Sequence, residues 1–364
     1  ISLQEMATRL CGSADLFATE PGRGAPASIN FVSCHDGFTL TDLTRYRSKH
    51  NEANGENNND GSSVNHSANF GVEGVTDDPD VIAAREQAAM NMIGMLLLSL
   101  GTPMMLAGDE FRNTQDGNNN AYCQDNDITW LKWDWMYSTN KTREMRRLET
   151  VSRLVALRKS LDLYHHEDFF TRLTQIGLLK PSSRVQWFLP DGTTPMERDW
   201  FDLGVRSFTM RLLSNSEVDV CIVVNGTADD RTFRLPPDTH WTPKWCSAEI
   251  NGRRAGHGTQ VEECDLNGDT TVWTQHVPDA SETVLKMVEE VAMQRTESST
   301  ENEADTIKFA MPVTDHAANG TSSAPRDEVS ADMPDAPVDD TPDTPVDDNV
   351  WTMPALSITL MKQV

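Results

Sequence analysis

The sequence predicts an α/β fold that is followed, after about residue 165, by an all-β sandwich. Two observations predict the α/β part: two apolar runs each end in acidic side chains, and a long polar loop and a helix separate them. The third observation is a change beyond residue 184, where short strands with turns replace helices. We therefore expect one domain over residues 1–165 and a second over residues 166–364.

Residues 1–10 open the chain with the pattern of a helix that lacks a capping residue. The apolar run of residues 27–37 follows and ends in His35, Asp36 and a glycine, which is typical of a buried parallel strand that delivers polar side chains to a loop. About 40 residues from Asn51 onward are too polar and too rich in Gly and Asn for a helix or strand. A loop of this length in a compact domain is usually functional or disordered.

A long helix is expected to begin after Asp78, which can cap it with Pro79 in the first position, and to end at Gly101. Its second half is apolar on almost every side, as in a buried helix. A second apolar run, residues 103–110, again ends in carboxylates, of which Asp109 is the first. Strand, loop, helix and strand in this order form a βαβ unit, so the two strands should be parallel.

Another polar loop, centred on Asn118, Asn119 and Asn120, follows the second strand. Three tryptophans within residues 130–135 come next, and they are more simply explained as core residues than as a platform for a sugar ring. A further helix is expected from about residue 142 to 161, and it closes the α/β part.

The sandwich strands are expected at residues 185–188, 207–213 and 218–225, with a final strand inside residues 350–361. Ahead of that strand, residues 296–349 hold 14 acidic and two basic side chains, which is -12 of the formal charge of -25. Such a segment cannot bury enough apolar surface to offset its ordering entropy, so we expect a disordered insertion within the β domain. A solvated spacer is the simpler interpretation of this insertion, and a partner-binding loop is the alternative.

The composition argues against two classes of protein. Acidic side chains outnumber Lys and Arg by 56 to 31, and a nucleic-acid binder needs clustered basic residues to neutralise phosphates. The chain contains no run of 18 apolar residues, so we expect no membrane-spanning segment. The six cysteines show no CxxC pair and no metal-ligand spacing, so we expect reduced thiols, no metal and no cofactor; the sequence leaves calcium binding open. No signal peptide is recognisable, so we expect a soluble protein that is not secreted.

The two acidic strand ends and the Asn-rich loops beside them are typical of the catalytic face of a (β/α)8 barrel. Asn and carboxylate side chains hydrogen-bond sugar hydroxyls, and exposed aromatic rings stack on sugar rings. These residue types therefore indicate a carbohydrate site, although each of them alone is also common in structural loops. By themselves the residues define half of an α/β enzyme with a polar cleft.

Five motifs along the first 135 residues carry a more specific signal. They are TRLCGSADLF at 8–17, SINFVSCHDGFTL at 28–40, KHNEANGENN at 49–58, GTPMMLAGDE at 101–110 and GNNNAYCQDN at 117–126. Together they resemble the second half of the catalytic barrel of isoamylase-type debranching enzymes, which act on glycogen or starch and belong to the α-amylase superfamily, glycoside hydrolase family 13. The resemblance implies that the C-terminal part of a (β/α)8 TIM barrel precedes an all-β sandwich.

The resemblance also implies a reaction. Such enzymes hydrolyse α-1,6-glucosidic branch linkages with retention, using a carboxylate nucleophile and a carboxylic general acid about 5 Å apart. It implies that Asp36 is a third carboxylate, which stabilises the transition state, and that His35 hydrogen-bonds the sugar hydroxyls. The substrates implied are branched α-glucans, namely glycogen, amylopectin and limit dextrins. The residues implied to line the cleft around the branch are Asp109, Asn118, Asn119 and Asn120.

One departure from that family concerns the catalytic pair. The nucleophile and the general acid lie on the fourth and fifth barrel strands of those enzymes, and residues 1–26 offer no carboxylate on a strand end. A whole barrel needs about 250 residues and eight strands, whereas two strands are expected here. We therefore expect part of a debranching hydrolase that does not hydrolyse a glycosidic bond on its own.

Two alternatives stay open at the level of sequence. The first is a non-catalytic α-glucan-binding scaffold protein that keeps the cleft but has no acid pair. The second is a transglycosylating relative, against which the debranching-type loops at residues 49–58 and 117–126 argue. Bacterial cytoplasm and plastid stroma are both compatible with the sequence as the location of the protein.

Overall fold

The computed structural model describes residues 2–19, 22–165, 169, 185–214, 219–237, 240–258, 260, 262–263 and 349–363. These residues belong to one compact unit, formed by residues 1–277 and 346–364. The acidic insertion predicted at residues 296–349 lies outside the described residues except at its last position.

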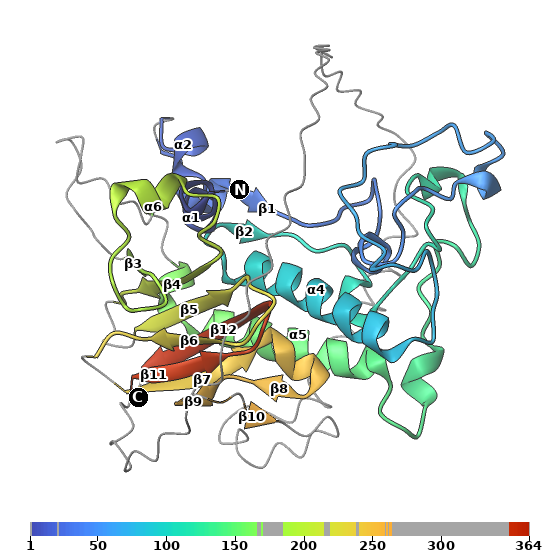
Figure 1. Ribbon diagram of the computed structural model, residues 1–364. Coiled ribbons are helices and arrows are strands. Elements are labelled where there is room, and N and C mark those ends of the chain that lie inside the picture. Colours follow the sequence, from blue (N-terminus) through green and yellow to red (C-terminus); the bar gives the residue numbers. More distant parts are fainter. Residues whose placement is uncertain are drawn as a thin grey trace, which may run out of the picture. The chain divides into compact units, whose positions relative to one another are not determined.

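Helices dominate the first half of the chain (Figure 1). The α-helices are α1 (Leu3–Leu10), α2 (Ala14–Phe17), α3 (Leu40–Leu43), α4 (Pro79–Leu98), α5 (Arg143–Ser160) and α6 (Glu197–Phe201). Short 3₁₀ helices are η1 (Ala25–Ala27), η2 (Glu52–Asn54), η3 (Asp109–Phe111), η4 (Ala121–Cys123), η5 (Asp134–Tyr137), η6 (Asp162–His165) and η7 (Ser247–Asn251).

Helix α1 begins with a cap, so the prediction of an uncapped helix is wrong. The Ser2 hydroxyl accepts a hydrogen bond from the backbone N–H of Glu5 (3.3 Å), and the Glu5 carboxylate accepts one from the backbone N–H of Ser2 (2.8 Å). This reciprocal pair is a capping box, which satisfies two donors that a helix start leaves free. Ser2 is the cap, with Glu5 at the third helical position, and this spacing was the signal in the sequence.

Strands β1 (Ile29–Asn30) and β2 (Thr102–Pro103) pair in parallel, as the βαβ pattern predicts. Both strands are much shorter than the apolar runs that contain them. The expectation of a buried strand is wrong for β1, because Ile29 is 60% exposed and Phe31, directly after the strand, is 53% exposed. Among the described residues β1 pairs with β2 alone, over the two residue pairs Ile29–Thr102 and Asn30–Pro103.

Helices α4 and α5 form where the sequence predicts them. Asp78 caps α4 by accepting hydrogen bonds from the N–H groups of Asp80 and Val81, and Pro79 occupies the first position. The hydroxyl of Thr142 caps α5 in the same way. Buried residues of α4, including Met90, Ile93 and Leu97, contribute to one hydrophobic core with α5 and the large sheet.

The second half of the chain contains the predicted strands. They are β3 (Val185–Phe188), β4 (Ser207–Leu212), β5 (Val220–Asn225), β6 (Arg231–Arg234), β7 (Trp241–Cys246), β8 (Arg253–Arg254), β9 (Gly256–His257), β10 (Glu262–Glu263), β11 (Val350–Met353) and β12 (Ser357–Gln363). An antiparallel sheet has the order β3-β4-β5-β12-β7, and a smaller one the order β6-β11-β9. The predicted final strand is confirmed as β12, which lies inside the large sheet between β5 and β7.

Alternation along β5 shows that the two sheets form a sandwich. Val220 and Ile222 contribute to the core shared with the helices, whereas Cys221 and Val223 join a second core. That second core also contains Phe233 of β6 and residues of β11, which belong to the small sheet. Successive side chains of a strand point to opposite faces, so the large sheet is covered by helices on one face and by the small sheet on the other.

The predicted boundary near residue 165 marks a change of secondary structure within one compact unit. Trp245 of β7 lies against Gly94 of α4, and its indole N–H donates to the carbonyl of Thr150 in α5 (3.2 Å). Among the described residues, α4 alone has the length and hydropathy of a membrane-spanning helix, and half of its most apolar window is buried inside this unit. In this fold α4 is a core helix that contacts α5 and β12, and Figure 1 shows it beside α5.

Candidate active site at the carboxyl ends of the parallel strands

His35 and Asp36 lie in the turn that follows β1. Their side chains are 86% and 78% exposed, and His35 Nε2 lies 3.4 Å from Asp36 Oδ2. Gly37, the next residue, has a φ of +90°, a conformation that favours glycine. The turn therefore presents an imidazole and a carboxylate side by side to solvent.

Asp109 follows β2 and is buried, with 2% of its surface exposed. One carboxylate oxygen accepts from the hydroxyl of Ser33 and the other from the backbone N–H of Leu40 (2.9 Å). Burial raises the pKa of Asp109 to about 6, although these hydrogen bonds act in the opposite direction. The expected meeting of the two strand ends is confirmed, but Asp109 faces the protein interior and not an open cleft.

Further hydrogen bonds join the segment after β1 to the segment after β2. The Thr39 hydroxyl donates to the carbonyl of Asn113 (3.1 Å), and Asp42 accepts from the backbone N–H of Gln115 (2.8 Å). The backbone N–H of Gly37 donates to the carbonyl of Asn119 (3.0 Å). The two segments are thus bonded along residues 33–42.

The Asn-rich loops are joined to each other by their own amides. Asn51 Nδ2 donates to Asn119 Oδ1 (2.9 Å), and Asn51 Oδ1 accepts from the backbone N–H of Asn119 (3.0 Å). Asn118 Nδ2 donates to Asn54 Oδ1 (2.8 Å), and Asn120 Nδ2 donates to a carboxylate oxygen of Asp60 (3.0 Å).

The three asparagines predicted to line the cleft differ in burial. Asn118 and Asn119 are 1% and 3% exposed, so their side chains bind neighbouring loops instead of lining an open surface. Asn120 is half-buried. Contact between Asn120 and a glucan stays a prediction, and the structure gives Asn118 and Asn119 a role in holding the loops together.

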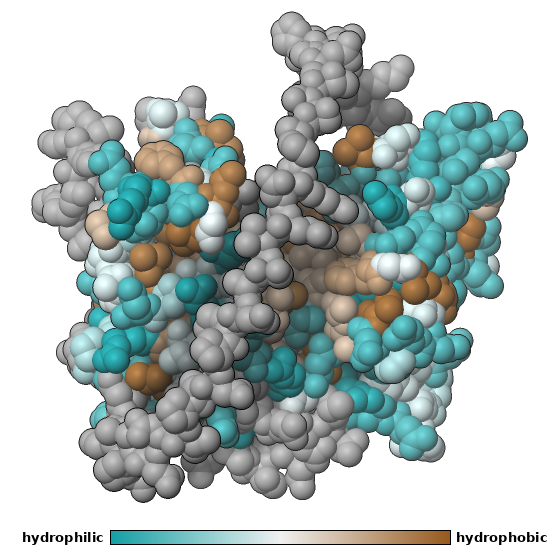
Figure 2. Space-filling view, viewed as in Figure 1, coloured by the Kyte–Doolittle hydropathy of each residue, from teal (hydrophilic) through white to brown (hydrophobic). Residues whose placement is uncertain are grey.

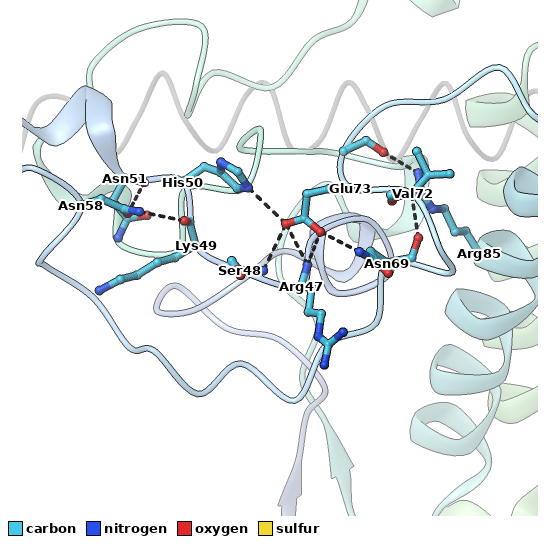
Figure 3. A network of polar contacts seen from close by, with 11 residues as sticks. Arg47, Ser48, Lys49, His50, Asn51, Asn58, Asn69, Val72, Glu73 and Arg85 are labelled. Atoms are coloured by element: carbon cyan, nitrogen blue, oxygen red, sulfur yellow. Dashed lines mark hydrogen bonds and ion pairs between the residues drawn. The ribbon is translucent and has the colours of Figure 1, made fainter.

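Glu73 anchors the loop that carries Asn51, a role that no pattern in the sequence indicates. Its carboxylate accepts from the backbone N–H groups of Arg47 and Ser48, from Asn69 Nδ2 (2.9 Å), and lies 3.1 Å from His50 Nε2 (Figure 3). Burial acts to raise the pKa of Glu73, but these hydrogen bonds lower it to about 2.

A buried ion cluster lies next to the strand end that carries Asp109. Glu86 of α4 forms ion pairs with Arg147 of α5 (2.8 Å) and with Arg112 (2.7 Å), and Arg112 also pairs with Glu144 (3.2 Å). Burial acts to raise the pKa of Glu86, and the two arginines hold it below its usual value. Arg147 is 1% exposed and donates to the backbone carbonyl of Asp109 (3.4 Å), which links the cluster to the strand end.

The prediction that the three tryptophans are core residues is wrong for Trp130, whereas Trp133 and Trp135 pack against a buried ring. Trp133 and Trp135 pack against Phe111 with ring centroids 4.7 and 5.4 Å away. Trp130 is 56% exposed, and its indole N–H donates to Asp125 (2.9 Å). Trp130 therefore has a ring face that solvent reaches, and Figure 2 shows that the surface around these loops, at the right of the view, is mostly hydrophilic.

One groove lies apart from this site. An apolar groove of about 560 Å³ runs between α1, β1 and α4, and its lining includes neither His35 nor Asp36. Within the described part of the chain, no group of three or more His, Cys, Asp or Glu side chains could hold a metal ion.

Comparison with known proteins shows which class of protein this chain is similar to. No protein-family model matches the sequence. The chain is 45% identical over 210 residues to the "Glycogen operon protein GlgX homolog" of Mycobacterium tuberculosis (strain ATCC 25618 / H37Rv), which covers 57% of this chain and 28% of that protein. It is 38% identical over 268 residues to the "Glycogen debranching enzyme" of Pectobacterium atrosepticum, which covers 73% of this chain and 37% of that enzyme.

The solved structures that match this chain have a lower sequence identity to it than these relatives have. A pullulanase from Bacillus acidopullulyticus aligns with a TM-score of 0.41 and 18% identity over 65% of this chain and 22% of that one. The catalytic module of the glycogen-degrading pneumococcal virulence factor SpuA aligns with a TM-score of 0.45 and 12% identity over 98% of this chain and 39% of that one.

The sequence matches confirm the predicted resemblance: the chain is homologous, over 57–73% of its length, to proteins named as a glycogen operon protein and a glycogen debranching enzyme. It spans between about three-tenths and two-fifths of the length of these curated relatives.

Proposed function

We propose that this chain is part of a debranching glycoside hydrolase that cleaves α-1,6-glucosidic linkages of glycogen or amylopectin with retention. The observation that carries the proposal is the exposed His35–Asp36 pair at the carboxyl end of β1, within a chain that is homologous to glycogen debranching enzymes. Glycosidases use carboxylates beside the scissile bond, which breaks through an oxocarbenium-like transition state.

In the proposed reaction Asp36 acts by charge. Positive charge develops on the sugar ring as the glycosidic bond breaks, and a fixed carboxylate nearby stabilises that charge more than it stabilises the neutral substrate. His35 donates or accepts a hydrogen bond at the sugar hydroxyls, which holds the ring against Asp36. The nucleophile and the general acid come from other barrel strands, so residues 1–364 alone are proposed to bind glucan without hydrolysing it.

A chimera tests the catalytic role. The segment of the Mycobacterium tuberculosis relative that matches this chain is replaced by the corresponding segment of this chain, and reducing ends released from amylopectin are measured. We expect turnover by the chimera and, for Asp36→Asn, a loss of kcat of about 100-fold or more, because removing one preorganised group costs about that much. Asp116→Asn, at an exposed carboxylate in the other loop, is the matched control. An Asp36→Asn chimera as active as its parent would disprove the role.

The isolated chain tests the other half of the proposal. Residues 1–364 should be retarded in a gel that contains glycogen, and His35→Ala with Asp36→Ala should remove the retardation. Reducing ends should not rise above those of the double variant. Turnover by the unaltered chain would contradict the proposal that the acid pair lies elsewhere, and retardation without turnover in the chimera as well would favour the glucan-binding scaffold.

A further inference from the structure

The turn that carries His35 and Asp36 has exposed side chains, yet its backbone is held at three points. Ser33, before the turn, donates its hydroxyl to Asp109. Leu40, after the turn, donates its N–H to the other oxygen of the same carboxylate (2.9 Å). Gly37, at the turn itself, donates its N–H to the carbonyl of Asn119 (3.0 Å).

We propose that Asp109 and the amide pair Asn51–Asn119 are positioning residues, which fix the backbone of the His35–Asp36 turn without contacting substrate. That the fixed turn meets a glucan rests on the proposed function. That these groups hold the turn does not, and it is testable on its own.

Asp109 is suited to this role by its burial and its chemistry. An ionised carboxylate only accepts hydrogen bonds, so one buried group can hold donors on both sides of a turn at once. The oxygens of Asp109 face Ser33 and Leu40, which are seven residues apart in sequence. Burial removes competing water, which strengthens each of these bonds.

The Asn51–Asn119 pair holds the third point. The carbonyl of Asn119 can accept from Gly37 only if the backbone of Asn119 is fixed. Asn51 fixes it by bonding both the backbone N–H and the side-chain oxygen of Asn119. Asn51 is fully buried and also donates to the carbonyl of Asp60 (2.9 Å). A side chain on Gly61 would come within 2.4 Å of Asn119 Oδ1 and 2.7 Å of Asn51 Nδ2, so the pair is packed directly against that glycine.

Substrate contact is the competing explanation for these residues, and burial argues against it. Asp109, Asn119 and Asn51 are 2%, 3% and 0% exposed, whereas the side chains of His35 and Asp36 are more than three-quarters exposed. A sugar ring reaches exposed groups first, and it would have to displace the loops to reach the buried ones. The buried polar groups are therefore assigned to the backbone of the turn.

Amide hydrogen exchange of the full chain, followed residue by residue by NMR, tests the proposal. In the unaltered protein the N–H groups of Gly37 and Leu40 should exchange slowly. Asn51→Ala should accelerate exchange at Gly37 by about fivefold, and Asp109→Ala should do so at Leu40, since a lost hydrogen bond is worth about 1 kcal/mol. Asp109→Asn keeps an oxygen for Leu40 and should restore part of the protection.

Two controls separate this role from a general loss of structure. Glu110→Gln alters a neighbouring carboxylate, which accepts from the N–H of Gly108, and Asn126→Ala alters a neighbouring amide, which bonds Gln124 and Ile128. They should leave Gly37 and Leu40 unchanged. The N–H groups of β5, in the middle of the large sheet, should exchange at the parental rate in every variant.

Glycogen retardation of the same variants gives the functional readout. Weaker retardation of Asn51→Ala together with faster exchange at Gly37 supports the whole proposal. Parental exchange at Gly37 and Leu40 in both alanine variants overturns it. If the unaltered chain is not retarded at all, the proposed function fails for this chain, and the exchange rates still decide whether these residues hold the turn.

Discussion

At the scale of single residues, burial assigns different roles to two carboxylates at neighbouring strand ends. Asp36 is exposed beside His35, and Asp109 is buried with both oxygens bonded to protein donors. An exposed carboxylate is available to a substrate, whereas a buried one serves the protein. Glu73 and Glu86 also serve the protein, since Glu73 holds a loop and Glu86 joins α4 to α5.

Glu86 should be costly to alter. Glu86→Gln removes the carboxylate that pairs with the buried guanidinium groups of Arg147 and Arg112, of which Arg112 keeps its pair with Glu144. Breaking a buried pair costs about 3–5 kcal/mol. The free energy of unfolding in urea measures the loss. Asp15→Asn, which removes one partner of the exposed Arg9–Asp15 pair, should cost about 1 kcal/mol or less. Equal losses in the two variants would refute the assignment.

Glu73 should stabilise the protein in a way that depends on pH. Its pKa is about 2 in the folded chain against an ordinary value of 4.5, so the ionised group stabilises the fold above the unfolded value. This contribution is lost as the pH falls from about 4.5 towards 2. The difference in urea midpoint between the unaltered chain and Glu73→Gln should therefore be largest near pH 7 and shrink at pH 3.

The control for that experiment is Glu52→Gln, at an exposed carboxylate of the same loop. Its difference from the unaltered chain should be small and should not shrink in the same pH window. A difference for Glu73→Gln that grows on acidification would contradict the assignment of Glu73 as an ionised anchor.

At the scale of elements, α4 connects the site to the sandwich. Arg85 of this helix donates to the carbonyls of Gly74 (2.6 Å) and Asn69 (2.9 Å), which holds the loop of Glu73 (Figure 3). The neighbouring Glu86 reaches the ion cluster, and Gly94 lies against Trp245 of the large sheet. One helix therefore contacts the long loops, α5 and the β-sandwich.

Gly94→Ala tests the packing between α4 and the sheet. Alanine favours a helix over glycine by about 1 kcal/mol, but its Cβ would lie 2.9 Å from the buried ring of Trp245. Overpacking of this kind costs about 1–3 kcal/mol, so we expect a net loss of stability in urea. The control is the same substitution in a Trp245→Phe background, where the smaller ring should make Gly94→Ala neutral or stabilising. Destabilisation of equal size in both backgrounds would show that Trp245 is not the cause.

At the scale of the whole molecule, the order of the strands within each sheet differs from their order in the sequence. Strand β12 comes last in the chain but lies between β5 and β7, while β11 lies between β6 and β9. Residues 297–348 precede both of them, so the sandwich is completed only by the segment that follows the acidic stretch.

Two deletions should therefore differ sharply. Removal of Ser357–Val364 takes out an inner strand of the large sheet and should abolish cooperative thermal unfolding, measured by circular dichroism. Replacement of residues 297–348 by a short Gly-Ser linker should keep the transition, because that stretch has few apolar residues to contribute to a core. A cooperative transition in the first variant, or its loss in the second, would contradict this expectation.

Much of the element pattern was predictable. Helices α4 and α5 have capping residues and apolar faces that are visible in the sequence, and β3, β4, β5 and the last strand have clear apolar runs. The cap of α1 was predictable as well, from the spacing of Ser2 and Glu5 at the start of the chain. The lengths of β1 and β2 could not be predicted, because a strand extends only as far as its neighbours pair with it.

The candidate site was predictable in its residue types but not in their roles. His35, Asp36, Asp109 and the asparagine loop were identified from their places after apolar runs. Glu73 was not, because nothing near it in sequence distinguishes it from other loop carboxylates. Its partners at Arg47 and Ser48 are 25 or more residues away along the chain.

The sequence by itself determined the parallel pairing of β1 with β2, the two long helices, the change to a β-sandwich and the resemblance to debranching enzymes, because each of these depends on local pattern or on motifs in order. Tertiary structure alone decided that Asp36 is exposed while Asp109, Asn118 and Asn119 are buried. It also decided that the α/β part and the sandwich share one core. Burial depends on which distant segments cover a residue, and that information is not contained in the neighbours of the residue along the chain.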